Sequence, residues 1–209
     1  MTQSTPQDKL TYHHGNLRQA LLFHAFEVIA QEGLAKLTLR ELARRAGVSH
    51  TAPYRHFKNK TDLIGSVAAE AFRDFRAFLE SRMNEQEAPL QRLEALCIGY
   101  VEFAVRHPDR FTLMFDAELP NKSVHTELQE TSMASFQLLI NAVTECQIDG
   151  VLRSGDPDDF ALTAWSMSHG LAVLYSEDQL VVKDGEDLEK IVRRAARNLY
   201  KGLGAPHVD

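Results

Sequence analysis

Apolar side chains recur every three or four positions along most of the 209-residue chain, which is the spacing of helices with one buried face. In residues 17–32, for example, Leu17, Leu21 and Ala25 lie on one face. Strand signals are nearly absent, because the one β-branched cluster, at residues 180–182, is too short to build a sheet. The pattern predicts an all-α fold.

Capping residues and prolines divide this pattern into about nine helices. Thr38 and Glu41 form a capping box, and Ser49 is expected to cap the next short helix. Pro53 stands within the first turns of that helix, so we expect local irregularity there. After residue 85 the helices become longer. The expected helices span residues 17–32 (capped by Asn16), 39–46, 49–56, 60–82 (capped by Asn59), 89–107, 110–116, 123–149, 158–176 and 186–201.

Three glycines and one aspartate give the clearest boundaries. Gly33, Gly47 and Gly150 each follow an apolar stripe and are expected to end a helix. Asp156 precedes Pro157, and this pair is typical of a helix start, with a capping carboxylate before a proline in the first helical position.

The net charge of the chain conceals a difference between its N-terminal segment and the rest. The formal charge of −6 by itself argues against a nucleic-acid partner. Residues 1–60, however, carry nine Lys and Arg against four Asp and Glu, a charge of +5. The remaining residues carry 14 basic and 25 acidic side chains, a charge of −11. A basic first segment joined to an acidic body favours a protein whose first segment alone meets nucleic acid.

Other classes of protein receive little support. No apolar run approaches the ~18–20 residues of a membrane helix, and residues 1–10 lack the apolar stretch of a signal peptide. Cys97 and Cys146 are too few and too far apart for a disulfide framework, and we expect both to be buried. No nucleophile–base pair or Gly-rich phosphate loop marks an active site. We therefore expect a cytoplasmic protein that is not an enzyme and that has no cofactor and no membrane partner.

Residues 38–49 have the layout of a helix-turn-helix. Leu39 and Leu42 supply apolar contacts, and Gly47 permits the turn between two crossed helices. The next helix, residues 49–56, is then the recognition helix, whose first residues meet base edges in the major groove. The side chains expected to offer hydrogen bonds, a methyl group and a cation to the bases are His50, Thr51, Ala52 and Arg55.

The run GVSHTAPYRHFKNKTDL at residues 47–63 resembles the signature of the TetR family of bacterial transcriptional regulators. The lead-in YHHGNLR at residues 12–18 and the block at residues 37–48 agree with it, so the resemblance covers residues 12–70 without gaps. It implies a three-helix helix-turn-helix DNA-binding domain over residues 12–72. It also implies a C-terminal helical bundle for effector binding and dimerisation over residues 85–203.

The resemblance also implies roles for single residues. Tyr54, His56, Lys60 and Thr38 match positions that contact phosphates in the family, and Arg40 matches a position that can reach a base. The expected helix N-termini at Thr38, Ser49 and Asn59 agree with this, because their free N–H groups can bind phosphate oxygens.

Other side chains in the basic segment have simpler interpretations. Phe57 is expected in the core and Tyr54 on the surface, while Arg44 and Arg45 are expected to be solvated rather than to read bases. The histidines lack a Cys or paired acid at ligand spacing, so no metal is expected. These histidines are His13, His14, His50 and His56.

In the acidic body, the run from Trp165 to Gly170 resembles a TetR subgroup with a Trp-x-x-x-His-Gly pattern. Trp165 and His169 lie four residues apart and therefore share a helix face. Two interpretations remain open: the pair lines an apolar effector pocket, or His169 is a hydrogen-bonded core histidine among packing aromatics. In the first interpretation, the ligand-binding residues are Phe111, Met114, Phe115, Phe136, Leu139, Trp165 and His169.

Family likeness places a homodimer interface on the last two helices, with Arg193, Arg194 and Arg197 as a solvated stripe. The apolar positions of these helices are Leu162, Leu171, Leu174, Ile191, Ala195 and Leu199. We therefore expect a homodimeric repressor that binds a palindromic operator in double-stranded DNA. A small, largely hydrophobic effector of unknown identity would release it. The alternative is a DNA-bound scaffold that is controlled by a protein partner and holds no small molecule.

Overall fold

The structure, a computed structural model, describes residues 17–180 and 187–204, so the expected cap Asn16 lies outside the described residues. Within these ranges all regular structure is helical, which confirms the predicted all-α fold. It comprises eight α-helices and three short 3-10 helices rather than nine α-helices. None of the helices described is long and apolar enough to cross a membrane. The chain divides into two compact units, Met1–Lys60 and Thr61–Asp209.

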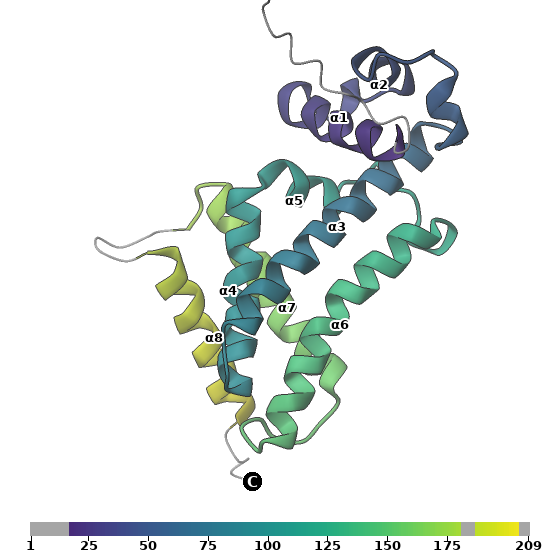
Figure 1. The fold of residues 1–209 in the computed structure, drawn as a ribbon. Helices are drawn as coiled ribbons and strands as arrows, with labels where there is room; N and C mark the ends of the chain where they lie inside the picture. Colours follow the sequence, from purple (N-terminus) through teal and green to yellow (C-terminus); the bar gives the residue numbers. More distant parts are fainter. Residues whose placement is uncertain (1–16, 181–186, 205–209) are drawn as a thin grey trace, which may run out of the picture. The chain divides into compact units, whose positions relative to one another are not determined.

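The first unit contains α1 (Leu17–Glu32), η1 (Leu34–Lys36), α2 (Leu39–Arg45) and η2 (Ala52–Arg55) (Figure 1). α2 packs against both α1 and η2. The apolar stripe of α1 faces this core, because Leu21, Leu22 and Ala25 are buried together with Phe57. Gly33 ends α1 with a φ of 85°, and its N–H donates to the Ile29 carbonyl at 3.0 Å. The predicted end of the first helix is confirmed.

The second unit is built around a central helix. α4 packs against α5, α6, α7 and α8, which Figure 1 shows grouped around it. Ten of the residues of α4 are buried, and a helix that is apolar on most sides is stable only when neighbours cover it. The helices of this unit are α3 (Lys60–Asn84), α4 (Pro89–Arg106), α5 (Pro108–Met114), η3 (Lys122–Val124), α6 (Thr126–Ile148), α7 (Pro157–Ser176) and α8 (Leu188–Gly204).

Local signals decide most helix ends in this unit. The Asp156 side chain accepts a hydrogen bond from the N–H of Asp158 at 3.0 Å, and Gly150 follows α6 with a φ of 73°. The start of α6 differs from the expected residue 123, because residues 122–124 form η3 instead. The cap is His125, whose Nδ1 accepts from the N–H of Leu128 at 3.2 Å.

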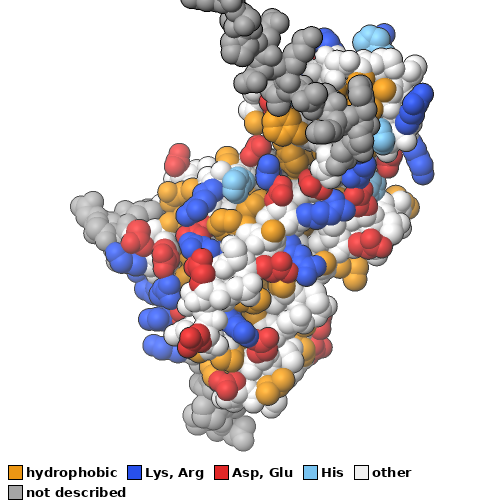
Figure 2. Space-filling view, viewed as in Figure 1, with side chains coloured by type: hydrophobic (Ala, Val, Ile, Leu, Met, Phe, Trp, Pro, Cys, Tyr) orange, Lys and Arg blue, Asp and Glu red, His pale blue; other side chains and the backbone are white. Residues whose placement is uncertain are grey.

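Two of the three arginines that the sequence placed in a solvated stripe of α8 also form ion pairs, although their side chains are 38% and 59% exposed. Arg193 donates to a Glu94 carboxylate oxygen at 2.9 Å, and Arg197 donates to the other oxygen at 3.1 Å. Glu94 lies on α4 and is only 4% exposed. A buried carboxylate is costly unless it is paired, so these ion pairs join α8 to α4. Figure 2 shows acidic and basic side chains interleaved over the visible face of this unit.

Candidate functional site

The two ends of α2 in the helix-turn-helix have the cap and the glycine turn that the sequence predicted. The Thr38 hydroxyl accepts from the N–H of Glu41 at 3.1 Å and caps α2. At the other end of α2, Gly47 has a φ of 65°, and the N–H of Val48 donates to the Ala43 carbonyl at 3.0 Å. This hydrogen bond, from the sixth residue to the first, closes a Schellman motif, whose fifth residue, here Gly47, has a left-handed conformation. Gly47 therefore sets the path of the chain into the recognition segment.

The recognition segment is a 3-10 helix, η2, and not the α-helix capped by Ser49 that the sequence predicted. Thr51 precedes η2, with no cap from its side chain. Pro53 supplies the physical reason, because it lacks the N–H that would bond to the Ser49 carbonyl in an α-helix. That carbonyl instead accepts from the N–H of Ala52 at 3.0 Å, a three-residue spacing. The predicted irregularity at Pro53 therefore extends over the whole segment.

The side chains predicted to meet DNA lie mostly at the surface of this unit. Tyr54 is 55% exposed, whereas Phe57, three residues on, is fully buried, as the sequence indicated. Ala52 and Lys60 are half-buried. Their contacts with DNA stay predictions. The exposed members of the set are Thr38, Arg40, Ser49, His50, Thr51, Tyr54, Arg55 and His56.

Four of the arginines of this unit fall into two groups. Arg44 and Arg45 both donate to the Glu41 carboxylate, with bonds of 2.6 to 2.9 Å, and these bonds lower the pKa of Glu41 to about 2. Arg45 also pairs with Glu32. Within the described part of the chain, Arg40 and Arg55 form no ion pair. These two cations remain available for phosphate or bases, whereas Arg44 and Arg45 bind to their own helix and to α1.

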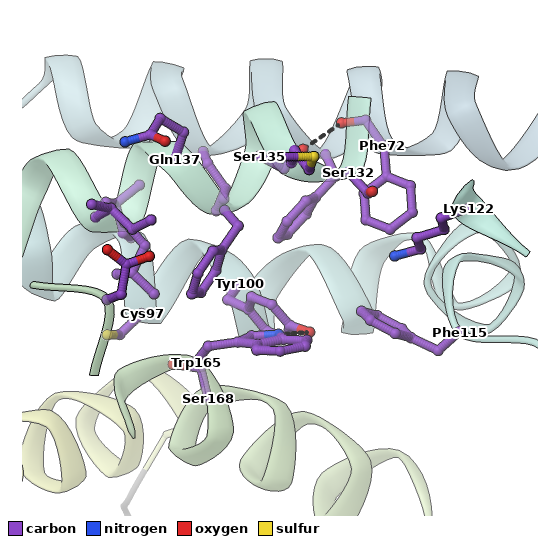
Figure 3. Close-up of a pocket in the computed structure, with 18 residues that line it drawn as sticks. Phe72, Cys97, Tyr100, Phe115, Lys122, Ser132, Ser135, Gln137, Trp165 and Ser168 are labelled. Atoms are coloured by element: carbon purple, nitrogen blue, oxygen red, sulfur yellow. Dashed lines mark hydrogen bonds between the residues drawn. The ribbon is translucent and has the colours of Figure 1, made fainter. Parts of the chain in front are cut away.

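The second unit contains a cavity of about 390 Å³, within the ~300–1,000 Å³ range of ligand pockets. Its walls come from α3, α4, α6 and α7, with Phe115 and Lys122 at one end of the view in Figure 3. The Ser135 hydroxyl on α6 lies 2.9 Å from the Thr131 carbonyl oxygen of its own helix and 3.3 Å from the Phe72 carbonyl oxygen on α3, so two of these walls meet closely there. Side chains on four helices therefore have to come together before the cavity exists.

One polar chain of hydrogen bonds crosses the aromatic wall. The indole N–H of Trp165 donates to the Tyr100 hydroxyl at 3.1 Å, and this hydroxyl lies 2.9 Å from Nδ1 of His169. Because an indole can only donate, the Tyr100 oxygen accepts from Trp165 and its proton remains available to Nδ1 of a neutral His169. Burial lowers the pKa of His169, which favours that neutral ring. Of the two interpretations of His169, the contact with Tyr100 agrees with the one in which its ring is hydrogen-bonded among packed aromatic side chains.

The structure separates the predicted ligand-binding residues into two sets. Phe115, Phe136, Leu139 and Trp165 line the cavity. Phe111 and Met114 are buried in the core, and they and His169 are absent from the cavity wall. Contact of any of these residues with a ligand stays a prediction.

Sequence reasoning missed Tyr100 and Lys122, which also line the cavity. Tyr100 stands in an apolar stripe, so periodicity marks it only as a core residue. Lys122 lies on a short segment between helices, and its sequence neighbours give no signal of an apolar surrounding.

Two family models match the chain. The model described as "Bacterial regulatory proteins, tetR family" matches residues 21–67, and the model described as "Tetracyclin repressor-like, C-terminal domain" matches residues 93–199. The helix-turn-helix and the helical body thus each have a counterpart in one family. The Trp-x-x-x-His-Gly subgroup stays a prediction.

Individual relatives agree with these matches. A protein of unknown function from Rhodococcus sp. RHA1 is 34% identical, with a TM-score of 0.82 over 94% of this chain and 100% of its own. The HTH-type transcriptional regulator YvkB of Bacillus subtilis is 21% identical over 88% of this chain and 96% of its own. The fatty acid degradation regulator FadR from Bacillus halodurans shares the fold, with 20% identity and a TM-score of 0.69 over 92% of this chain and 98% of its own. The chain belongs to the TetR family of DNA-binding transcriptional regulators.

Proposed function

We propose that this regulator is a homodimeric repressor that leaves a palindromic operator when a small, largely apolar ligand enters the body. The cavity of about 390 Å³ carries this proposal, because it lies in the unit that does not contain the helix-turn-helix. A body controlled only by a protein partner would need no such cavity. The aromatic wall suits an apolar ligand, since the Tyr100 hydroxyl is already hydrogen-bonded to Trp165 and His169.

A contact within the second unit gives the ligand a route to the start of α3. His125 follows η3, which carries the cavity residue Lys122. The Nε2 of His125 lies 3.3 Å from the carbonyl oxygen of Asp62, in the first turn of α3. Since α3 begins where the first unit ends in the sequence, a shift of this segment can alter how the two DNA-binding units of a dimer are held. Two recognition segments must reach successive major grooves for tight operator binding.

The dimer interface in this proposal uses apolar side chains of α7 and α8 that the chain itself leaves uncovered. Leu162 is 50% exposed and Leu174 is 44% exposed, and Leu199 is half-buried. Ile191, which the sequence placed in the interface, is 6% exposed because it packs within its own chain, so we omit it. Substituting Leu162 and Leu174 by Glu together is expected to yield monomers in sedimentation experiments and to weaken operator binding.

The test of ligand release begins with selection of an operator from random double-stranded DNA by the full-length protein. Candidate ligands are then found from changes in Trp165 fluorescence, since Trp165 lines the cavity and is the one tryptophan of the sequence. We expect a ligand at saturation to weaken operator binding by about 5- to 150-fold, and operator DNA to weaken ligand binding by the same factor. An operator affinity that stays unchanged while the cavity is saturated would refute ligand release.

A further inference from the structure

The apolar cavity has one cationic wall residue among the described residues that line it, Lys122. Its Nζ lies 5.0 Å from the centroid of the Phe72 ring. In Figure 3 the ammonium group points inward between Phe72 and Phe115, at the opposite end of the cavity from Cys97. Lys122 is an exposed residue, which places it at the solvent side of the cavity. Its ammonium group nevertheless lies over an aromatic ring.

Among the described residues, the ammonium group of Lys122 has no carboxylate partner, although most arginines of the same unit are paired. Asp158 also lines the cavity but forms no ion pair with Lys122. Partial burial lowers the pKa of Lys122 below its ordinary value, as is expected for an ammonium group without a counter-ion. An anion bound at this end would restore the interaction that desolvation removes.

We propose that the cavity binds a carboxylate with an apolar chain, whose carboxylate group pairs with Nζ of Lys122 and whose chain lies along the apolar wall. This inference rests on the proposed function, because the bound carboxylate would be the ligand that releases the operator. A single ammonium group fits a monoanion. A phosphate would call for several donors or a planar Arg fork, and no arginine lines the cavity within the described residues.

The apolar wall runs away from Lys122 and can cover an extended chain. Phe75 and Leu79 on α3, Leu96 on α4 and Ile140 on α6 all line it. None of these side chains has a polar atom, so an alkyl or aryl group gains by leaving water along this wall. A ligand with its only charge at one end therefore matches a cavity with its cation at one end.

The test measures binding of three probes to the full-length protein by Trp165 fluorescence, below the concentrations at which they form micelles. The probes are decanoate, 1-decanol and decylammonium, which share a chain and differ in charge. We expect decanoate to bind about tenfold more tightly than decanol, the ratio that one charge-assisted hydrogen bond supplies. Decylammonium is expected to bind more weakly than decanol because it faces Lys122.

Variants separate the charge of Lys122 from its packing. Lys122→Met is expected to remove the preference for decanoate while leaving the affinity for decanol within about twofold. Lys122→Arg is expected to keep the preference. Lys36→Met is the matched control, since Lys36 is an exposed lysine of η1 in the other unit, and it should change neither affinity.

Each contrary result has its own meaning. Equal affinity for decanoate and decanol, or a preference that survives in Lys122→Met, would overturn the carboxylate inference and leave an apolar ligand in place. Tighter binding of decylammonium would overturn it in favour of Asp158 as the charged partner. Failure of all three probes to bind would overturn it as well. If decanoate binds as expected and a selected operator is not released, ligand release fails while the carboxylate site stands.

Discussion

Replacing Gly65 of α3 by Ala tests how tightly the segment around η3 packs against this helix. A Cβ atom at Gly65 would lie 2.5 Å from Cδ2 and 2.6 Å from Nε2 of His125, and 2.8 Å from Cγ of Pro120. Real Cβ atoms essentially never approach another heavy atom this closely. The substitution Gly65→Ala therefore requires His125 and Pro120 to move.

Movement of His125 is costly because both of its ring nitrogens are in use. Nδ1 caps α6 by accepting from the N–H of Leu128, and Nε2 lies within reach of Asp62. Overpacking of this kind costs ~1–3 kcal/mol, whereas Gly to Ala inside a helix by itself gains ~1 kcal/mol. Because three heavy atoms lie within 2.8 Å of the added Cβ, we take the upper part of the overpacking range, about 2–3 kcal/mol. After subtraction of the ~1 kcal/mol gain, Gly65→Ala should lower the free energy of unfolding by about 1–2 kcal/mol.

Urea unfolding followed by Trp165 fluorescence measures this change, because Trp165 belongs to the same unit as Gly65. With a slope of ~2 kcal/mol per molar urea, the midpoint should fall by about 0.5–1 M. Wild type and variants are compared at one protein concentration, since dimerisation links stability to concentration. Gly170→Ala is the matched control, because Gly170 lies inside α7 and a Cβ there meets nothing within 4 Å in its own chain. Gly170 shares the α7 face proposed for the dimer, so both glycine variants are also measured with Leu162 and Leu174 replaced by Glu. Gly170→Ala should be neutral or stabilising.

A second variant isolates the contact with His125. In the His125→Ala background the two nearest of the three closest atoms to the Gly65→Ala Cβ are removed and Pro120 remains, so the substitution should cost less than it does in the wild type. The difference between the two costs is expected to be about 1 kcal/mol or more. If Gly65→Ala raised the midpoint as Gly170→Ala does, or cost the same with and without His125, the argument from close packing would be wrong.

Three further predictions concern the DNA interface, an ion pair and a titrating group. Lys60→Ala should weaken binding to all DNA sequences alike and reduce the salt dependence of log K by about one unit. His50→Ala should instead relax discrimination at particular base pairs by ~1–3 kcal/mol. Filter binding to operator and scrambled DNA measures both effects, and equal behaviour of the two variants would contradict this division of roles. Arg193→Met should lower the free energy of unfolding by about 1–2 kcal/mol, because it weakens the pairing of the buried Glu94. This cost should be smaller in the Glu94→Gln background. An equal cost in the wild type and in Glu94→Gln would show that the Arg193–Glu94 ion pair does not contribute. Burial lowers the pKa of His169 from its ordinary value of 6.5, so the unfolded chain binds the proton more readily and the wild type should lose stability as the pH falls below 6.5. Urea midpoints of His169→Gln should fall less over this pH range. Identical pH profiles for the wild type and the variant would refute this role of His169.

Features that depend on a few neighbouring residues were predictable from the sequence alone. Thr38 caps α2, Gly33 and Gly150 end α1 and α6, and Asp156 starts α7, because each effect acts within one turn of the chain. The contrast between exposed Tyr54 and buried Phe57 followed from helical periodicity in the same way. Even the error at the recognition segment was local in origin, since Pro53 removes one donor and the segment closes as a 3-10 helix.

The cavity and the polar contacts of the body, in contrast, depend on residues that lie far apart in the sequence. Tyr100 and His169 are 69 residues apart in the chain, and Arg197 and Glu94 are 103 apart. Periodicity predicts which face of a helix is apolar, but the partner of that face depends on how α4 is surrounded by its neighbours. Lys122 shows this most clearly: its own segment is polar and exposed, and its aromatic surroundings come from α3 and from the end of α5. The candidate ligand site therefore arises from packing between distant helices, which no local pattern records.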